Sequence, residues 1–181
     1  MASEVKANKI SPATGTALQI GDSGDTVTIP SGATITNSGT QTGFGKILQV
    51  VHANYATEVT TGASAVSTGV TATITPASAS NKIIVFATIN GVQKDNTNAN
   101  GRITLQVDRD GSLVHNVQAN LWNYTAQTFR NGGFSILYVD SPSSTSAVVY
   151  TIKFSGADLV ACYVNKDSNS GASYITLMEI A

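Results

Sequence analysis

The side chains best suited to contact a ligand gather in the second half of the chain. Between residues 118 and 133 the only tryptophan stands among other aromatic and amide side chains, and a second polar stretch follows between residues 155 and 172. Aromatic faces stack on the C–H surfaces of sugars, while amide, carboxylate and guanidinium groups bond to hydroxyls. We therefore expect a glycan site formed by Trp122, Asn123, Tyr124, Arg130, Asn131, Asp167 and Asn169. Other polar residues of these stretches, Asn165 among them, are expected to add contacts or to solvate the rim.

Residues that favour catalysis are fewer. Asp158 and Asp167 lie in one stretch and are the only candidates we find for the paired carboxylates of a glycoside hydrolase. No phosphate-binding loop of the GxxxxGKS type occurs, and His52 and His115 have no Cys or carboxylate at the spacing of a zinc site. Residues 21–25 are typical of a turn rather than of a calcium loop. We predict no enzyme activity, no metal and no cofactor, with a small depolymerase as the alternative.

The charge balance excludes several classes of partner. The 181 residues carry 10 basic and 11 acidic side chains, none of them clustered, so the chain lacks the basic patch that nucleic acid or an anionic membrane surface requires. No apolar run approaches the length of a membrane span, and the first twenty residues contain no signal-peptide core. We therefore expect no membrane insertion and no Sec-dependent export. The single Cys162 is expected to be a small buried hydrophobe.

Composition favours strands over helices, because Val, Ile, Thr, Ser and Gly are common and typical helix formers are scarce. Residues 1–15 are polar and are expected to be an extended attachment segment. Residues 16–45 place short apolar stretches between tight turns, which is too little to form a core alone. This segment is either disordered or covered by other copies of the chain, and we favour a short, intertwined trimeric β shaft. The side chains expected at its trimer interface are Leu18, Ile20, Val27, Ile29 and Ile35.

Residues 46–181 predict an antiparallel β-sandwich. Ile103, Leu105 and Val107 alternate with polar residues, as in a strand with one wet face, and Asp110-Gly111 is a two-residue hairpin signal. The predicted strands are 46–53, 68–75, 82–92, 102–108, 113–117, 134–139, 147–154 and 173–180. Eight strands joined in this way indicate an all-β knob of the jelly-roll, TNF/C1q-like type.

The predicted strands also indicate where a second chain would pack. Residues 83–86 are apolar on both faces, which is typical of an interior strand. The first strand places Ile47 and Val51 on one face and Leu48 and Val50 on the other, and the last strand is also apolar on both faces. Either these two are edge strands with one face left for a neighbouring chain, or both are central strands. On the first interpretation the trimer interface includes Leu48, Val50, Tyr174 and Met178.

Alternating strand direction sorts the connections between the two ends of the sandwich. The long connections 55–67, 93–101, 118–133 and 155–172 all lie at the end far from the shaft, and the short connections 76–81, 110–112 and 141–146 all lie at the near end. Long loops on a rigid scaffold are where binding surfaces are usually built. The predicted glycan site therefore lies at the far end.

Four stretches carry a resemblance to a known family. They are VKANKISP at residues 5–12, GTALQIGDSGDTVTIPSGATI at 15–35, GKILQVV at 45–51 and YVDSP at 138–142. As an ordered set they resemble tail fibre proteins of tailed bacteriophages, especially those that infect cyanobacteria and marine bacteria, over nearly the whole chain.

The resemblance implies a homotrimeric receptor-binding fibre of the virion, assembled in the host cytoplasm. Residues 1–15 would attach it to tail or baseplate proteins, and the knob would bind host cell-surface polysaccharide. Knobs of this family vary most in their loops, so no binding residue is carried over by position. The very short shaft leaves a purely structural baseplate component as a further alternative.

Overall fold

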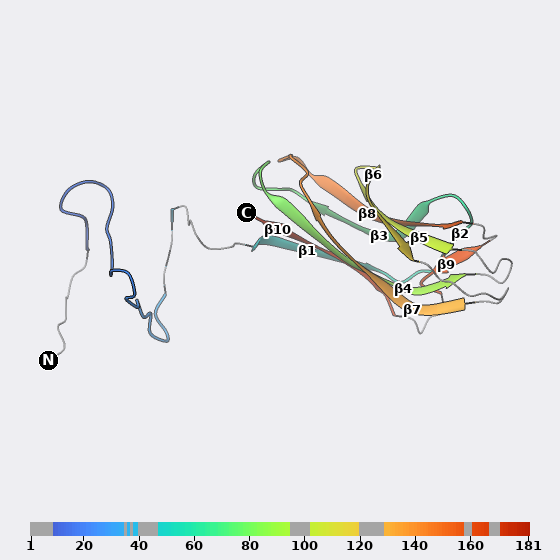
Figure 1. The fold of residues 1–181 in the computed structure, drawn as a ribbon, viewed down its shortest axis with the longest axis horizontal. Coiled ribbons are helices and arrows are strands. Elements are labelled where there is room, and N and C mark those ends of the chain that lie inside the picture. The colour runs from blue at the N-terminus through green and yellow to red at the C-terminus, as the bar shows by residue number, and fades with distance from the viewer. Residues whose placement is uncertain are drawn as a thin grey trace. The chain divides into compact units, whose positions relative to one another are not determined.

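The chain divides into two units, residues 1–43 and residues 44–181, and each is described by itself. The computed structural model describes residues 9–34, 36, 38, 39, 47–94, 102–119, 129–157, 161–166 and 171–181 (Figure 1). For residues 118, 119 and 129–132 it describes the backbone alone.

In the first unit, the described residues form turns and no strand. The amide of Asp25 donates to the carbonyl of Asp22 at 3.0 Å, and the amide of Asp22 donates to the Asp25 carboxylate at 2.8 Å. The turn predicted at residues 21–25 is therefore confirmed. The large apolar side chains of this unit, Leu18, Ile20, Val27 and Ile29, are 44–68% exposed in a single chain. Their burial between copies of the chain stays a prediction, and Ile35 lies outside the described residues.

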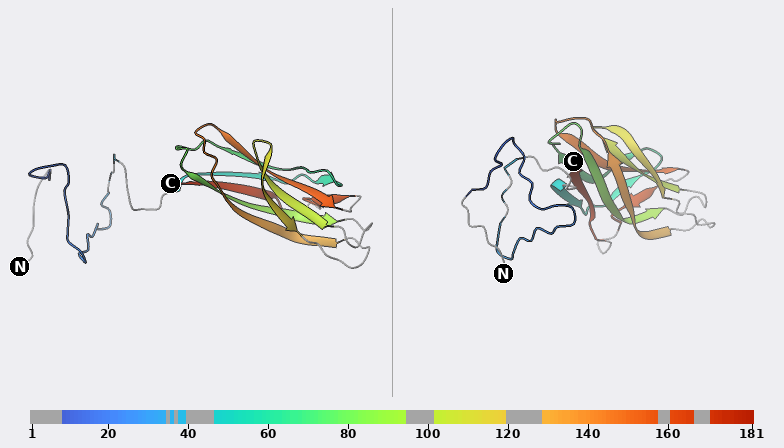
Figure 2. Two further views of the ribbon diagram at one scale, coloured as in Figure 1. Left: turned by 45° about the horizontal axis from the view of Figure 1, so that its top comes forward. Right: turned by 60° about the vertical axis from the view of Figure 1, so that its left-hand side comes forward.

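The second unit is a sandwich of two antiparallel sheets, seen as two layers in Figure 2. Sheet A contains β1 (Ile47–Tyr55), β2 (Val59–Thr61), β4 (Lys82–Lys94), β7 (Phe129–Asp140), β9 (Cys162–Val164) and β10 (Ser173–Ile180). Sheet B contains β3 (Val66–Ile74), β5 (Arg102–Arg109), β6 (Ser112–Ala119) and β8 (Val148–Ala157). β4 pairs with β7 along one edge, and with β10 and then β9 along the other.

All eight predicted strands are present, and they confirm the all-β sandwich. The eight long strands lie in the order β1-β10-β4-β7 in sheet A and β3-β8-β5-β6 in sheet B. This order is that of a jelly roll. No helix occurs in the described part of the chain, and hence none there is long and apolar enough to cross a membrane.

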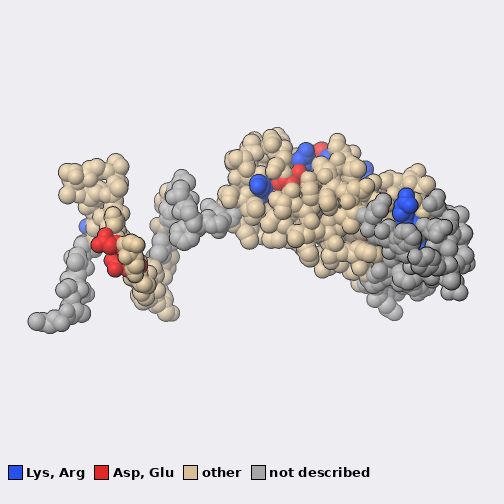
Figure 3. Space-filling model, viewed as in Figure 1, with Lys and Arg blue, Asp and Glu red and all other residues tan. Residues whose placement is uncertain are grey.

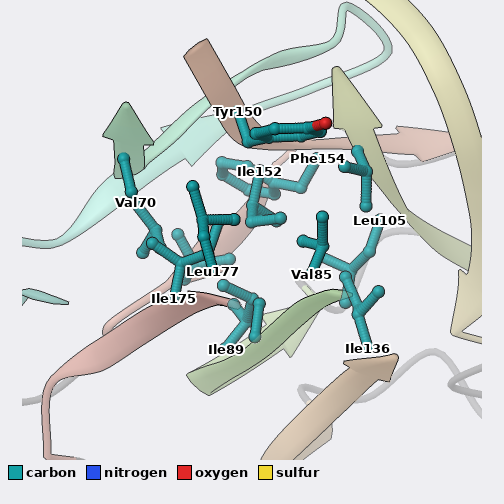
Figure 4. Packing of buried hydrophobic residues seen from close by; sticks show 14 of the residues in the cluster. Val70, Val85, Ile89, Leu105, Ile136, Tyr150, Ile152, Phe154, Ile175 and Leu177 are labelled. Atoms are coloured by element: carbon teal, nitrogen blue, oxygen red, sulfur yellow. The ribbon is translucent and has the colours of Figure 1, made fainter. Parts of the chain in front are cut away.

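The core lies between the two sheets and is built from alternate residues of each strand. β10 shows the pattern most simply, because Ile175 and Leu177 are fully buried while their neighbours are only partly so. Branched apolar side chains fill most of the space, and Tyr150 and Phe154 of β8 are the large aromatic members (Figure 4). Cys162 is fully buried among them, as predicted.

A buried carboxylate ties three strands together where β7 ends. Asp140 accepts hydrogen bonds from Arg109 of β5 at 3.0 and 2.8 Å and from the Tyr150 hydroxyl of β8 at 2.6 Å. Burial and the hydrogen bond to Asp140 raise the pKa of Tyr150, which therefore stays a neutral donor. Arg109 balances the charge of Asp140, and the network crosses from one sheet to the other.

Glu179 forms a second buried anchor, near the start of β1. Its carboxylate accepts bonds from Gln49 at 2.6 Å, from the amide of Ala77 at 2.7 Å and from Asn81 at 2.6 Å. Burial alone would raise the pKa of Glu179, but these donors favour its charged form and hold the pKa below the ordinary value. The anchor fixes the loop between β3 and β4 against β1 and β10.

Strand direction confirms how the connections are sorted. We call the end at which β1 begins the near end, and the opposite end the far end. The connections 75–81, 110–111 and 141–147 lie at the near end, and the strand ends that flank the other connections lie at the far end. The division by length is only partial, since β4 and β5 are seven residues apart, as are β3 and β4 at the near end. The predicted hairpin is also confirmed, since Asp110 and Gly111 both have positive φ, 49° and 83°.

Three details differ from the predictions. β2 and β9 are short strands inside two predicted far-end connections, where they pair with each other. β7 begins at Phe129, so residues 129–133 belong to a strand and not to a loop, because they pair with the last residues of β4. The last strand, β10, lies between β1 and β4 and is interior, whereas β1 is an edge strand, so neither of the two alternatives holds for both strands.

Candidate functional site

The predicted glycan residues are only partly within the described structure. Trp122, Asn123, Tyr124, Asp167 and Asn169 lie outside the described residues, as does Asp158, which the depolymerase alternative needs. The two others lie in β7, where Arg130 pairs with Gln93 and Asn131 with Val92 of β4. Their prediction as loop residues is wrong, but β7 enters the sandwich from the far end and so places both there.

The described part of the far end carries one cluster of polar and aromatic groups. Lys166 forms an ion pair with Glu58 at 2.8 Å, and its ammonium lies 4.5 Å from the centre of the Tyr163 ring. Tyr163 pairs in register with Gln93, whose buried Oε1 accepts no hydrogen bond from any described residue. An aromatic ring, a cation and an amide acceptor are the kinds of group that bind hydroxylated ligands.

Asn165 has a structural role rather than one at the rim. It is buried, its Nδ2 donates to the carbonyl of Thr57 at 3.0 Å, and its backbone amide donates to the carbonyl of Asn90 at 2.8 Å. The hydroxyl of Ser173 donates to its Oδ1. A φ of 52° also suits asparagine, which tolerates the left-handed region. The expectation that Asn165 contacts ligand or solvent is therefore wrong.

The outer face of sheet A is largely apolar across all four of its long strands in the part nearer the near end. Antiparallel register brings Val50 of β1, Met178 of β10, Ile84 of β4 and Val139 of β7 into one row. His52, Thr176, Phe86 and Leu137 form the next row, and Asn54, Tyr174, Thr88 and Ser135 form the third. We call the larger side chains of this surface the assembly face: Ile47, Val50, His52, Ile84, Phe86, Leu137, Val139, Tyr174, Thr176 and Met178.

The apolar side chains of the assembly face are unusually exposed. Leu137 is 68%, Ile47 58%, Val50 58% and Val139 50% exposed in a single chain. Large exposed apolar side chains that adjoin one another mark interaction surfaces more often than ordinary surface does. The outward positions of the three rows carry no acidic or basic side chain other than His52.

The outer face of sheet B is different in character. Thr71 and Thr151 lie side by side on β3 and β8 with their hydroxyls 3.1 Å apart, and Lys153 forms an ion pair with Asp108 at 2.5 Å. Val149, 38% exposed, is the large apolar residue of β8 on that surface. In Figure 3 most of the charged side chains visible on the sandwich lie in small groups along its upper part, where Figure 1 labels strands of sheet B, and much of the remaining described surface in that view is uncharged. The outer face of sheet B is therefore more polar than that of sheet A.

The structure brings together three of the four sandwich residues that were predicted at a trimer interface. Val50 and Met178 are register partners, and Tyr174 projects from the same face. Leu48 is half-buried at a β-bulge between Ile47 and Gln49. Because of this bulge Ile47 is exposed while Val51 packs on the core, so placing both on one face was wrong.

The half of this face that lies on β4 and β7 was not predicted from the sequence. The doubly apolar residues 83–86 were assigned to the sheet interior, which is correct, but their outer side chains were not assigned to an interface. The signal in β7 was the run Ile136-Leu137-Tyr138-Val139, which is apolar on both faces although β7 is an edge strand. An edge strand of this kind has a second surface to cover.

Comparison with known proteins adds no assignment to this description. Among the described residues no group of three or more His, Cys, Asp or Glu side chains is placed to hold a metal ion. No protein-family model matches the chain, and no curated protein matches it significantly.

Proposed function

We propose that this chain is a homotrimeric tail fibre protein of a tailed bacteriophage. Its N-terminal residues attach to the tail or baseplate, and the far end of its sandwich binds host cell-surface glycan without cleaving it. The resemblance of the sequence to such fibres suggests this function. The observation that carries the trimeric part is the assembly face, an uncharged apolar surface formed by four strands of one sheet.

Burial of the assembly face supplies a driving force for association. Moving a Leu, Val or Ile side chain from water into a packed environment is worth about 1.5–3 kcal/mol. Four side chains of the face are at least half exposed in one chain, and Ile84, Phe86 and Met178 add partly exposed area. In a ring of closed cyclic symmetry the assembly face of every copy is covered. An open chain of copies would leave this face uncovered on the last copy.

The arrangement of the sandwich supports the direction of the fibre. The chain enters β1 at the near end, where the connections are short and where Glu179 and Asp140 anchor the structure. The strand ends that flank the other four connections, and the cluster of Tyr163, Lys166 and Glu58, lie at the opposite end. A fibre attached through its N-terminus would therefore present the far end to the host.

The test is adsorption of the purified protein to host cells. The double variant Trp122→Ala with Tyr124→Ala should reduce cell binding at least tenfold, and purified host polysaccharide should compete with the unaltered protein. Leu113→Ala, at an exposed position next to the near-end hairpin, is the matched control and should bind normally. Unchanged adsorption of the double variant would remove these residues from recognition and favour a structural baseplate role. Release of reducing sugar from the polysaccharide would favour the depolymerase instead.

A further inference from the structure

The rows of the assembly face contain one side chain of a type that ordinarily changes charge between about pH 5 and pH 8, and it is His52. His52 projects from β1 in the same row as Phe86 and Leu137, and its side chain is exposed in a single chain. Its Nδ1 lies 3.0 Å from the Thr176 hydroxyl, and its ring centre lies 5.9 Å from that of Tyr174. The contact with Thr176 orients the ring and leaves Nε2 free of any described partner within the chain.

No described carboxylate shares this surface with His52. On the neighbouring strand β10 the facing groups are Thr176 and Tyr174, and the next strand, β4, contributes Phe86. Of the described cations, Lys82 lies on the outer face of β4, where it pairs with Ile180 at the near end. Glu179 is also on β10, but its side chain is on the inner side and is held by Gln49, Ala77 and Asn81. Glu58, beyond the end of β1, is paired with Lys166.

Protonation therefore has a different cost in the single chain and in the assembly. In the single chain an imidazolium is hydrated. When three assembly faces meet about one axis, each imidazolium would lose water and find the same apolar, carboxylate-free surface opposite it. Neutral imidazole meets a smaller penalty, because it carries no charge and its Nδ1 keeps the contact with Thr176. Histidine is the side chain that ordinarily changes charge between about pH 5 and pH 8.

We propose that His52 makes the trimer acid-sensitive, so that the sandwiches associate at neutral pH and separate at about pH 5. This inference rests on the proposed homotrimer and concerns the regulation of its interface. The chain contains only two histidines, and the other, His115, stacks on Tyr138 between β6 and β7, with ring centres 4.6 Å apart. His115 is thus a natural control.

The experiment is sedimentation equilibrium of the full chain at pH 7.5 and pH 5.0, over a range of concentrations. We expect the trimer to weaken by about tenfold for each histidine, and so by about a thousandfold for three, when the pH falls to 5.0. The variants His52→Gln and His52→Phe, both uncharged at either pH, should remain trimeric at pH 5.0. His115→Gln should dissociate at pH 5.0 as the unaltered chain does. Circular dichroism should show that the separated chains keep their strands.

Each other outcome overturns the inference in a recognisable way. A trimer that is equally strong at both pH values shows that assembly is correct and that His52 does not regulate it. Dissociation of both His52 variants at pH 5.0 assigns the effect to another group. Loss of strand signal at pH 5.0 assigns it to unfolding. A chain that is monomeric at pH 7.5 contradicts the proposed trimer itself, and the inference with it.

Discussion

Gly69 of β3 and Tyr55 of β1 close one side of the sandwich by direct contact. Gly69 has a φ of +85° and lies within a register shift between β3 and β8. A Cβ atom at this position would lie 2.2 Å from the Tyr55 ring, which is closer than any real contact. Only glycine lets the backbone take this conformation while the ring packs on it.

The first prediction follows from this contact. Gly69→Ala should lower the free energy of unfolding by more than about 2 kcal/mol, because it adds a steric clash to the cost of the positive φ. The control is Gly111→Ala, since Gly111 has almost the same φ of +83° but nothing within 4 Å of the added carbon. It should cost about 1 kcal/mol. Urea denaturation measures both, and equal costs would contradict a role for Tyr55.

Glu179 allows a second prediction, on pH dependence. Replacing it by glutamine turns one acceptor oxygen into a donor that faces the donors of Gln49, Ala77 and Asn81, and should cost about 1–3 kcal/mol at pH 7. The pKa of Glu179 is lowered in the folded chain, so its stabilising effect is present above the pKa of the unfolded chain. That effect is lost as the pH falls through the lowered folded value.

The measurement is the unfolding free energy of the unaltered chain and of Glu179→Gln at pH 7 and at acid pH. The difference between them should shrink on acidification, and a difference that stays constant or grows would contradict the assignment. Glu58→Gln is the control. Its exposed pair with Lys166 should contribute less than about 1 kcal/mol.

The alternation of apolar and polar residues predicted a strand well wherever one face of that strand is exposed to solvent. β5 and β8 alternate regularly, and both were predicted within a few residues. β2 and β9 were missed because each has three residues, and they pair with each other across about a hundred residues of sequence. A local sequence pattern cannot reveal a pairing between segments so far apart in the chain. The bulge at Leu48 was missed for a related reason, since only the partner strand reveals which residue is extra.

The assembly face could be predicted in part from the sequence, whereas the glycan site could not be checked against the described residues. Two strands with apolar residues on both faces correctly indicated an exposed apolar surface, and its contact with a partner stays a prediction; sequence alone did not show that β4 and β7 continue it. That continuity depends on the order β1-β10-β4-β7, which joins residues such as Val50 and Val139 that are far apart in the chain. The glycan residues rest on side-chain chemistry, and they stay a prediction.

The assembly face predicts how two similar substitutions differ. Leu137→Asp should change the stability of a single folded chain by less than about 0.5 kcal/mol, because Leu137 is 68% exposed, yet it should prevent association by placing a charge in the interface. Val149→Asp introduces the same charge on the outer face of sheet B and should leave association unchanged. Size-exclusion chromatography with light scattering compares the two. Equal behaviour of the variants would contradict the choice of face.

At the scale of the whole molecule, both units expose apolar side chains that a single chain leaves uncovered. Leu18, Ile20, Val27 and Ile29 do so in the first unit, and the assembly face does so in the second. Copies of the same chain would cover both sets at once, which is the reason to expect a trimer. The exposed side chains of one unit alone would support the proposed trimer less strongly.

The mass of the unaltered full chain in solution at neutral pH tests this account most directly. Light scattering or sedimentation at micromolar concentration should give three times the 18.7 kDa of one chain. A stable species with the mass of a single chain would contradict it, because the exposed apolar side chains of both units would then need no partner.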